Sequence, residues 1–122
     1  MARILITEDE DSLRSFVARA LRMDGHETVE AADGAEGLEA LAEGRFDLLL
    51  SDIRMPAMDG IAMAQQIARG FPDLKILLMT GYAEQRERAK SLEAIVSEVM
   101  VKPFTIADLR ATVLKVIERS IG

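Results

Sequence analysis

The sequence predicts an α/β fold with one doubly wound sheet of five parallel strands and helices on both of its faces. Short apolar runs alternate with segments of helical periodicity along all 122 residues, which is the pattern of repeated strand–helix units. No Pro-, Gly- or Ser-rich linker interrupts this alternation. We therefore expect residues 1–122 to form a single domain.

The predicted strands are residues 3–7, 27–31, 47–51, 75–80 and 98–101. Three of them contain unbroken apolar runs, at residues 4–6, 48–50 and 76–79, and such runs are typical of parallel strands that are buried on both faces. Right-handed crossovers then place helices on both sides of the sheet. Five strands of this kind favour the order 2-1-3-4-5.

The segments between the strands carry their apolar residues on one stripe, which predicts amphipathic helices. The stripe is clearest at Leu13, Phe16, Val17, Ala20 and Leu21, and again at Leu109, Val113, Val116 and Ile117. Asp33 and Thr105 each stand three residues before an acid, and Asp59 precedes the third helix, so all three are expected to cap helices. The fourth helix, residues 83–92, is mostly polar and is expected to pack lightly.

Composition and charge exclude several classes of protein. A formal net charge of -6 argues against a nucleic-acid surface, because phosphate binding depends on clustered Lys and Arg. The chain has no cysteine, which excludes disulfides and thiolate metal sites. No apolar run approaches the roughly 18 residues that span a bilayer, and no signal-peptide pattern precedes the first strand. We expect a cytoplasmic protein that binds neither nucleic acid nor membrane.

Polar side chains stand at the carboxyl ends of four of the five predicted strands. Glu8 and Asp9 follow the first strand, Asp52 follows the third, Thr80 ends the fourth and Lys102 follows the fifth. Each has a structural explanation when taken alone: Asp9 could cap a helix and Asp52 could form a turn. Ligands bind doubly wound sheets at this edge, between the first and third strands, so the joint pattern predicts a functional site.

The acids at this edge are expected to require a cation. Two carboxylates about 4 Å apart repel each other by roughly 4 kcal/mol at an effective dielectric of about 20, and Lys102 alone cannot neutralise three of them. The sole histidine, His26, falls in a predicted loop far from this edge and is interpreted as a surface residue. With oxygen donors only, the site favours Mg²⁺ over zinc.

A magnesium site of this kind indicates phosphoryl transfer, because Mg²⁺ held by few carboxylates keeps coordination positions that suit phosphate oxygens. Asp52 is the expected nucleophile, attacking phosphorus. Lys102 is expected to stabilise the equatorial oxygens, and the Thr80 hydroxyl to bind the attached phosphoryl group.

At these residues the sequence resembles the response-regulator receiver family of two-component systems, which has the flavodoxin-like (CheY-like) fold. The matching segments are ILITEDE (4–10), SDIRMPAMDG (51–60), MTG (79–81) and VKPF (101–104). The resemblance implies that Asp52 is the phosphoacceptor, that Glu8 and Asp9 are the acid pair, and that Asp9 binds Mg²⁺ directly. It also implies the backbone carbonyl of Arg54 as a Mg²⁺ ligand, Thr80 as the switch hydroxyl, Lys102 as the phosphate-binding lysine and a cis peptide between Lys102 and Pro103.

The sequence departs from the family pattern at two positions. The acid pair usually reads Asp-Asp, and Glu8 is one methylene longer. The position three residues before the lysine is usually aromatic and is Val99 here. An aromatic rotamer switch at this position is therefore in doubt. Tyr82 or Phe104 could replace the missing ring as the side chain that moves, or either could instead pack in the core or at an interface.

The resemblance also implies partners. A receiver takes its phosphoryl group from a histidine kinase or histidine phosphotransferase, and catalyses only its own phosphorylation and dephosphorylation. With no output domain expected after the last helix, signalling would run through protein contacts. Within the family, MARILI (1–6) and LLMTGYAEQRERAKSLEA (77–94) resemble the CpdR-type single-domain regulators. That likeness implies an adaptor for a ClpX-type AAA+ unfoldase in ClpXP proteolysis, switched off by phosphorylation.

Other functions remain open at this point. The chain could be a phosphorelay intermediate or a chemotaxis-like receiver, which the sequence separates only by resemblance. A remoter alternative is a haloacid-dehalogenase-like phosphatase with Asp9 as its nucleophile, although no suitable second acid pair follows. Flavin binding is disfavoured because four consecutive acids, residues 8–11, would repel a flavin phosphate. A nucleotide-binding P-loop motif is absent.

Overall fold

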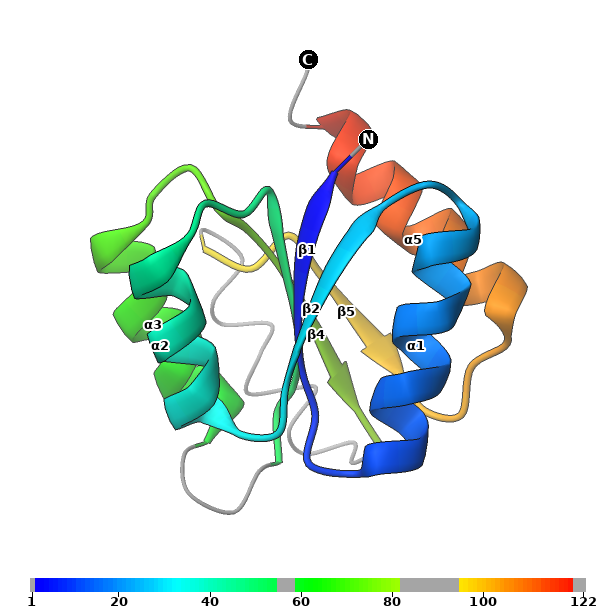
Figure 1. Cartoon of the computed structure of the whole chain (residues 1–122), viewed down its shortest axis with the longest axis horizontal. Helices are drawn as coiled ribbons and strands as arrows, with labels where there is room; N and C mark the ends of the chain where they lie inside the picture. The colour runs from blue at the N-terminus through cyan, green and yellow to red at the C-terminus, as the bar shows by residue number, and fades with distance from the viewer. Residues whose placement is uncertain (1, 55–58, 82–94, 120–122) are drawn as a thin grey trace.

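The computed structural model describes residues 2–54, 59–81 and 95–119. A five-stranded parallel sheet stands at the centre, with helices on either side (Figure 1). Its strands are β1 (Arg3–Thr7), β2 (Glu27–Ala31), β3 (Leu48–Asp52), β4 (Lys75–Thr80) and β5 (Glu98–Val101). The strand order is β2-β1-β3-β4-β5. The doubly wound fold and the strand order predicted from the sequence are thus confirmed.

Strand β3 begins one residue later than expected. Asp47 lies outside it, and its side-chain Oδ2 accepts a hydrogen bond from the backbone amide of Arg3 at 2.8 Å. The strand also ends one residue later than expected, at Asp52, which is paired in register with Met79. The shift brings the predicted phosphoacceptor onto the strand tip itself.

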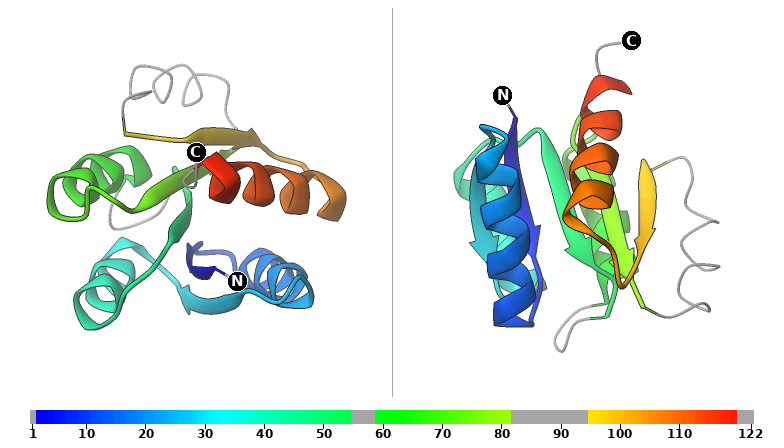
Figure 2. Two further views of the ribbon diagram at one scale, coloured as in Figure 1. Left: turned by 90° about the horizontal axis from the view of Figure 1, so that it is seen from above. Right: turned by 90° about the vertical axis from the view of Figure 1, so that its right-hand side faces the viewer.

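The helices form two layers, one on each face of the sheet. Figure 2 shows α2 (Gly34–Glu43) and α3 (Gly60–Gly70) on one side, with α1 (Asp11–Met23) and α5 (Ile106–Arg119) on the other. The predicted fourth helix, residues 83–92, lies outside the described residues. Within the described part of the chain, no helix has the length and apolar character needed to cross a membrane.

The core divides between the two faces because successive side chains of a strand point to opposite sides. Leu5 and Leu49 face α2 and α3, whereas Ile4, Ile6 and Leu50 face α1 and α5. Strands β1, β3 and β4 are buried along nearly their whole length. The prediction that these three strands are covered on both sides is therefore confirmed.

The helix starts follow the capping signals in the sequence. Asp33 Oδ1 accepts from the Glu36 amide at 2.9 Å, and Asp59 Oδ1 accepts from the Ile61 amide at 2.8 Å. Thr105 Oγ1 accepts from the amide of Asp108 at 3.0 Å. These contacts fix the connections that enter α2, α3 and α5.

The structure adds detail on two individual side chains. Phe16 belongs to the predicted apolar stripe of α1, yet it is 37% exposed, since that stripe is wider than the surface that α1 buries. His26, expected at the surface, is half-buried, and its Nδ1 accepts a hydrogen bond from the Ala2 amide at 3.2 Å. It lies in the connection just before β2, at the opposite end of the sheet from the predicted site, as expected.

Candidate phosphoacceptor and metal site

Three carboxylates meet at the carboxyl ends of β1 and β3. Glu8 and Asp9 follow β1 directly, and Asp52 ends β3. One carboxylate oxygen from each of the three lies within 4.8 Å of the other two. Glu8 and Asp52 are buried, whereas Asp9 is exposed. The two neighbouring strand tips therefore bring together the acids that the sequence places there.

Lys102 supplies the positive charge of this cluster. Its Nζ lies 3.0 Å from Glu8 Oε1 and 3.3 Å from Asp52 Oδ2. The backbone amide of Lys102 donates to the carbonyl of Thr80 at 2.8 Å, which holds it against the end of β4. The Lys102–Pro103 peptide is cis. One ammonium group thus faces two buried carboxylates.

The electrostatics of Glu8 show that this charge is incompletely compensated. Burial, followed by the neighbouring Asp52 carboxylate, raises the pKa of Glu8 from 4.5 to about 7, against the opposing effect of Lys102. For Lys102, burial would lower the pKa, but the hydrogen bond to Glu8 and the nearby Asp52 charge outweigh it and raise the pKa above 10.5. Lys102 is therefore held as a cation, and a further positive charge nearby would stabilise the ionised form of Glu8.

The donor atoms fit a hard divalent cation. Glu8 Oε2 is buried and has no hydrogen-bond partner among the described residues, so one carboxylate oxygen remains available next to Asp9 and Asp52. All three groups offer oxygen, the ligand that Mg²⁺ prefers. Glu8, Asp9 and Asp52 are thus the side chains that would hold Mg²⁺ here.

The structure describes four further predicted site residues, namely Arg54, Thr80, Val99 and Phe104. Thr80 is buried at the end of β4, and Arg54 is exposed two residues after Asp52. Val99 is half-buried in β5 beside Leu78 of β4 and packs on the core under α2 and α3. Phe104 packs against the core under α1 and α5. Tyr82 lies outside the described residues.

Sequence reasoning missed one residue beside the site. Arg14 lies in the first turn of α1, and its Nη1 donates to the backbone carbonyl of Glu8 at 2.7 Å. Its only signal in the sequence is a basic residue five positions after Asp9, and a basic residue near the start of a helix is common in exposed helices. The contact requires the actual path of the connection between β1 and α1, which periodicity does not give.

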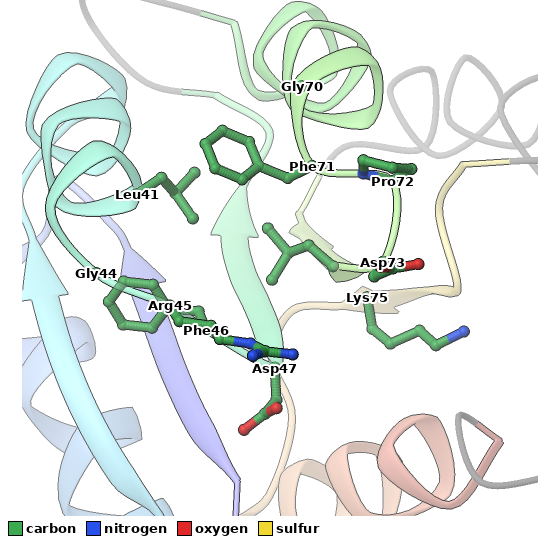
Figure 3. Close-up of a pocket in the computed structure, with 11 residues that line it drawn as sticks. Leu41, Gly44, Arg45, Phe46, Asp47, Gly70, Phe71, Pro72, Asp73 and Lys75 are labelled. Atoms are coloured by element: carbon green, nitrogen blue, oxygen red, sulfur yellow. The ribbon is translucent and has the colours of Figure 1, made fainter.

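A cavity of about 450 Å³ lies at the other end of the sheet. It is formed by the ends of α2 and α3 and the connections that lead into β3 and β4, and Figure 3 shows Leu41 and Phe71 pointing toward each other across it. Asp52 and Thr80 lie at the opposite ends of the same two strands. This hollow is therefore separate from the acid cluster.

Comparison with known proteins identifies relatives along almost the whole chain. The family model described as the response regulator receiver domain matches residues 4–114. The response regulator receiver protein CpdR of Brucella abortus (strain 2308) is 40% identical over 109 residues, which cover 89% of this chain and 91% of that protein. The sensor kinase CckA of the same strain is 37% identical over 121 residues, which are 97% of this chain but 13% of the kinase. The chain therefore matches nearly all of one relative and a small part of the other.

Solved structures show the same fold. The response regulator TrrA from Thermotoga maritima, in complex with Mg²⁺ and BeF, is 34% identical with a TM-score of 0.86, covering 95% of this chain and 99% of that one. A CheY-like receiver domain protein from Methanospirillum hungatei JF-1 is 28% identical with a TM-score of 0.91, covering 98% and 96%.

Proposed function

This chain belongs to the response regulator receiver family, and from that premise we propose that it accepts a phosphoryl group on Asp52 in a Mg²⁺-dependent reaction. The observation that supports the proposal most directly is the cluster of Glu8, Asp9 and Asp52, whose carboxylate oxygens lie within 4.8 Å of one another. Lys102 contacts two of the three acids. The donor is a histidine kinase or a histidine phosphotransferase, since receiver domains take phosphoryl groups from phosphohistidine.

The chemistry follows from the positions of the side chains. A carboxylate oxygen of Asp52 attacks phosphorus, an O–P bond forms, and the N–P bond to the donor histidine breaks. The ammonium of Lys102, 3.3 Å from Asp52, stabilises negative charge on the phosphoryl oxygens. The hydroxyl of Thr80, at the end of the neighbouring strand, binds the phosphoryl group once it is attached.

Glu8, Asp9, Asp52 and the backbone carbonyl of Arg54 would hold Mg²⁺, which would neutralise negative charge during the transfer. Glu8 provides its second oxygen, Oε2, for direct or water-mediated contact. Burial, followed by the neighbouring Asp52 carboxylate, raises the pKa of Glu8 and so disfavours its ionised form, and a bound cation would relieve this. The similarity to a response regulator solved with Mg²⁺ and BeF is consistent with this site.

Incubation with acetyl phosphate and Mg²⁺ tests the phosphoacceptor. We expect a phosphorylated species on a phosphate-affinity gel, lost with EDTA and lost in Asp52→Ala. Asp9→Asn is the matched comparison, because it changes a neighbouring acid in the same cluster. This variant should bind Mg²⁺ more weakly and need a higher Mg²⁺ concentration, but Asp52 should remain the modified residue. An acyl phosphate mapped to Asp9 instead would support the phosphatase-like alternative and refute the proposal.

We further propose that the chain is a CpdR-like adaptor that presents substrates to a ClpX-type AAA+ unfoldase and is switched off by phosphorylation. The support is similarity: the chain is 40% identical to a CpdR protein and covers 91% of it. Output would then run through protein contacts of a single domain. A phosphorelay intermediate or a chemotaxis-like receiver would use the same chemistry with a different partner.

Pull-down with purified unfoldase distinguishes these roles. The unmodified protein should bind, and the same protein treated with beryllofluoride and Mg²⁺ should bind at least tenfold more weakly. Asp52→Ala serves as the control, since it should bind whether or not beryllofluoride is present. Absence of binding in every state would remove the adaptor role and leave the phosphoacceptor proposal intact.

A further inference from the structure

Arg14 joins three segments around the connection between β1 and α1. Its Nη1 donates to the carbonyl oxygen of Glu8 at 2.7 Å, and its Nη2 donates to Asp11 Oδ1 at 2.7 Å. Its Nε lies 3.5 Å from Glu30 Oε1 in β2. The side chain is only 16% exposed. A planar guanidinium with five donors can serve several acceptors at once in a fixed geometry, which the lysine ammonium cannot match.

The contact with Glu8 constrains the peptide that links the acid pair. The amide of Glu8 donates to the carbonyl of Ala31 at 3.1 Å, and its carbonyl accepts from Arg14. Because Glu8 and Asp9 share that peptide unit, a rotation there would displace both carboxylates relative to Asp52. Mg²⁺ demands near-ideal octahedral geometry, so such a displacement would weaken its binding.

We infer that Arg14 is a positioning residue for the Mg²⁺ site, holding the backbone between Glu8 and Asp9 so that both carboxylates point at Asp52. The inference rests on the proposed function in taking these three acids as the metal site. Loss of a group that orients metal ligands typically costs 10–100-fold in metal affinity. We expect Arg14→Ala to raise the Mg²⁺ dissociation constant by about tenfold.

A second arginine of the same helix provides a matched control. Arg22 Nη1 lies 3.8 Å from Glu30 Oε2 and donates to Thr28 Oγ1 at 3.2 Å. It therefore ties α1 to β2, as Arg14 does, but through contacts with β2 and not with the acid pair. Arg22→Ala removes a charge from the same helix and a partner from the same glutamate. A generic effect of charge or of α1 packing would appear in both variants.

The experiment measures Mg²⁺ binding by calorimetry and the Mg²⁺ dependence of phosphorylation by acetyl phosphate. In Arg14→Ala, the half-saturating Mg²⁺ concentration should rise about tenfold. The phosphorylation rate at saturating Mg²⁺ should stay within about twofold of the parent rate, because Asp52 and Lys102 are unchanged. Arg14→Lys, which keeps the charge but not the forked geometry, should fall between parent and Arg14→Ala. Arg22→Ala should match the parent. Thermal unfolding in EDTA checks that every variant folds.

A second readout tests the positioning without metal. Hydrogen exchange of the Glu8 amide, followed by NMR in EDTA, should be faster in Arg14→Ala than in Arg22→Ala. Equal Mg²⁺ affinity and equal exchange in the two variants would overturn the inference while leaving the phosphoacceptor proposal standing. If the parent bound no Mg²⁺, the proposed function would fail, and the inference, which rests on it, would fail with it.

Discussion

The ammonium of Lys102 lies 3.0 Å from the Oε1 of Glu8, a contact between residues 94 positions apart along the chain. Glu8 is 1% exposed, and its other oxygen has no hydrogen-bond partner among the described residues. The lysine therefore satisfies one oxygen of a buried carboxylate and leaves the second available. This half-compensated acid is what prepares the edge of the sheet for a cation.

Replacement of Lys102 should strongly slow phosphorylation of Asp52. In Lys102→Met, the positive charge that faces Asp52 at 3.3 Å is lost, and loss of one such stabilising group typically costs about 100-fold or more in rate. We expect the initial rate of phosphorylation by acetyl phosphate to fall by about that factor at saturating Mg²⁺. The rate is measured on phosphate-affinity gels.

Lys115 provides the control for this substitution. Its Nζ lies 3.1 Å from Glu98 Oε2, in an exposed pair on α5 and β5. Lys115→Met removes the same side chain from a surface ion pair, which contributes little. A Lys115→Met rate as low as that of Lys102→Met would show that the effect does not arise at the acid cluster.

The stability of the Mg²⁺-free protein should depend on pH through Glu8. Burial and Asp52 raise its pKa to about 7 in the folded protein, against 4.5 for the ordinary group, so the ionised form is disfavoured in the fold. The free energy of unfolding should therefore decrease as the pH rises from about 4.5 to about 7, by up to about 3 kcal/mol. Urea unfolding in EDTA across this range measures the change.

Glu8→Gln removes the titrating group while keeping a side chain of nearly the same size. The difference in stability between parent and variant should change across this pH range and level off above it, because all other groups are common to both proteins. Parallel curves for the two proteins would mean that Glu8 titrates near its ordinary pKa. The interpretation that Lys102 only partly compensates the buried Glu8 carboxylate would then be wrong.

Mg²⁺ should stabilise the folded protein. A ligand that binds only the folded state, at 100 times its dissociation constant, adds about 2.7 kcal/mol. We expect a rise in the melting temperature with Mg²⁺ that EDTA reverses. The rise should be larger at pH 8 than at pH 5.5, because protonation of Glu8, whose pKa is about 7, competes with the cation.

Asp9→Asn isolates the metal contribution, because Asp9 is exposed and its loss removes a ligand without opening the core. Its melting temperature in EDTA should be near that of the parent, and Mg²⁺ should raise it much less. An equal Mg²⁺-induced rise in both proteins would exclude Asp9 as a ligand.

The sequence predicts the meeting of Glu8, Asp9 and Asp52 because parallel strands end at one edge of the sheet, and strand identity is readable from the apolar runs. It does not predict that Glu8 is buried while its neighbour Asp9 is exposed. That difference depends on the turn after β1 and on Lys102, which lies 94 residues later in the sequence. Side-chain contacts between residues this far apart cannot be predicted from the periodicity of apolar residues.

The sequence predicts the bounds of β3 to within one residue, and it predicts the buried face of α1 except at Phe16. Strand β3 lies one residue later at each end than predicted, because its ends are set by pairing with β1 and β4. The exposure of Phe16 depends on how much of α1 the sheet and α5 cover. Both outcomes are decided by tertiary packing.

Helix α2 packs closely against β1 at Gly37, near the site. A Cβ added there would lie 2.6 Å from Thr7 Cγ2 and 2.8 Å from Met63 Cε. The methionine can move, but Thr7 is a buried, β-branched residue of the sheet that directly precedes Glu8. Gly37→Ala should therefore destabilise the protein by about 1–3 kcal/mol, despite the better helix propensity of alanine.

Gly70, the last residue of α3, is the matched control because an added Cβ there would meet nothing within 4 Å. Gly70→Ala should leave stability unchanged or raise it by up to about 1 kcal/mol. Urea unfolding of both variants measures the contrast. Since the strain at Gly37 is transmitted to the residue next to Glu8, Gly37→Ala should also weaken Mg²⁺ binding. Equal stability of the two variants would show that α2 shifts away from β1 at little cost, and that the acid pair is not rigidly supported from that side.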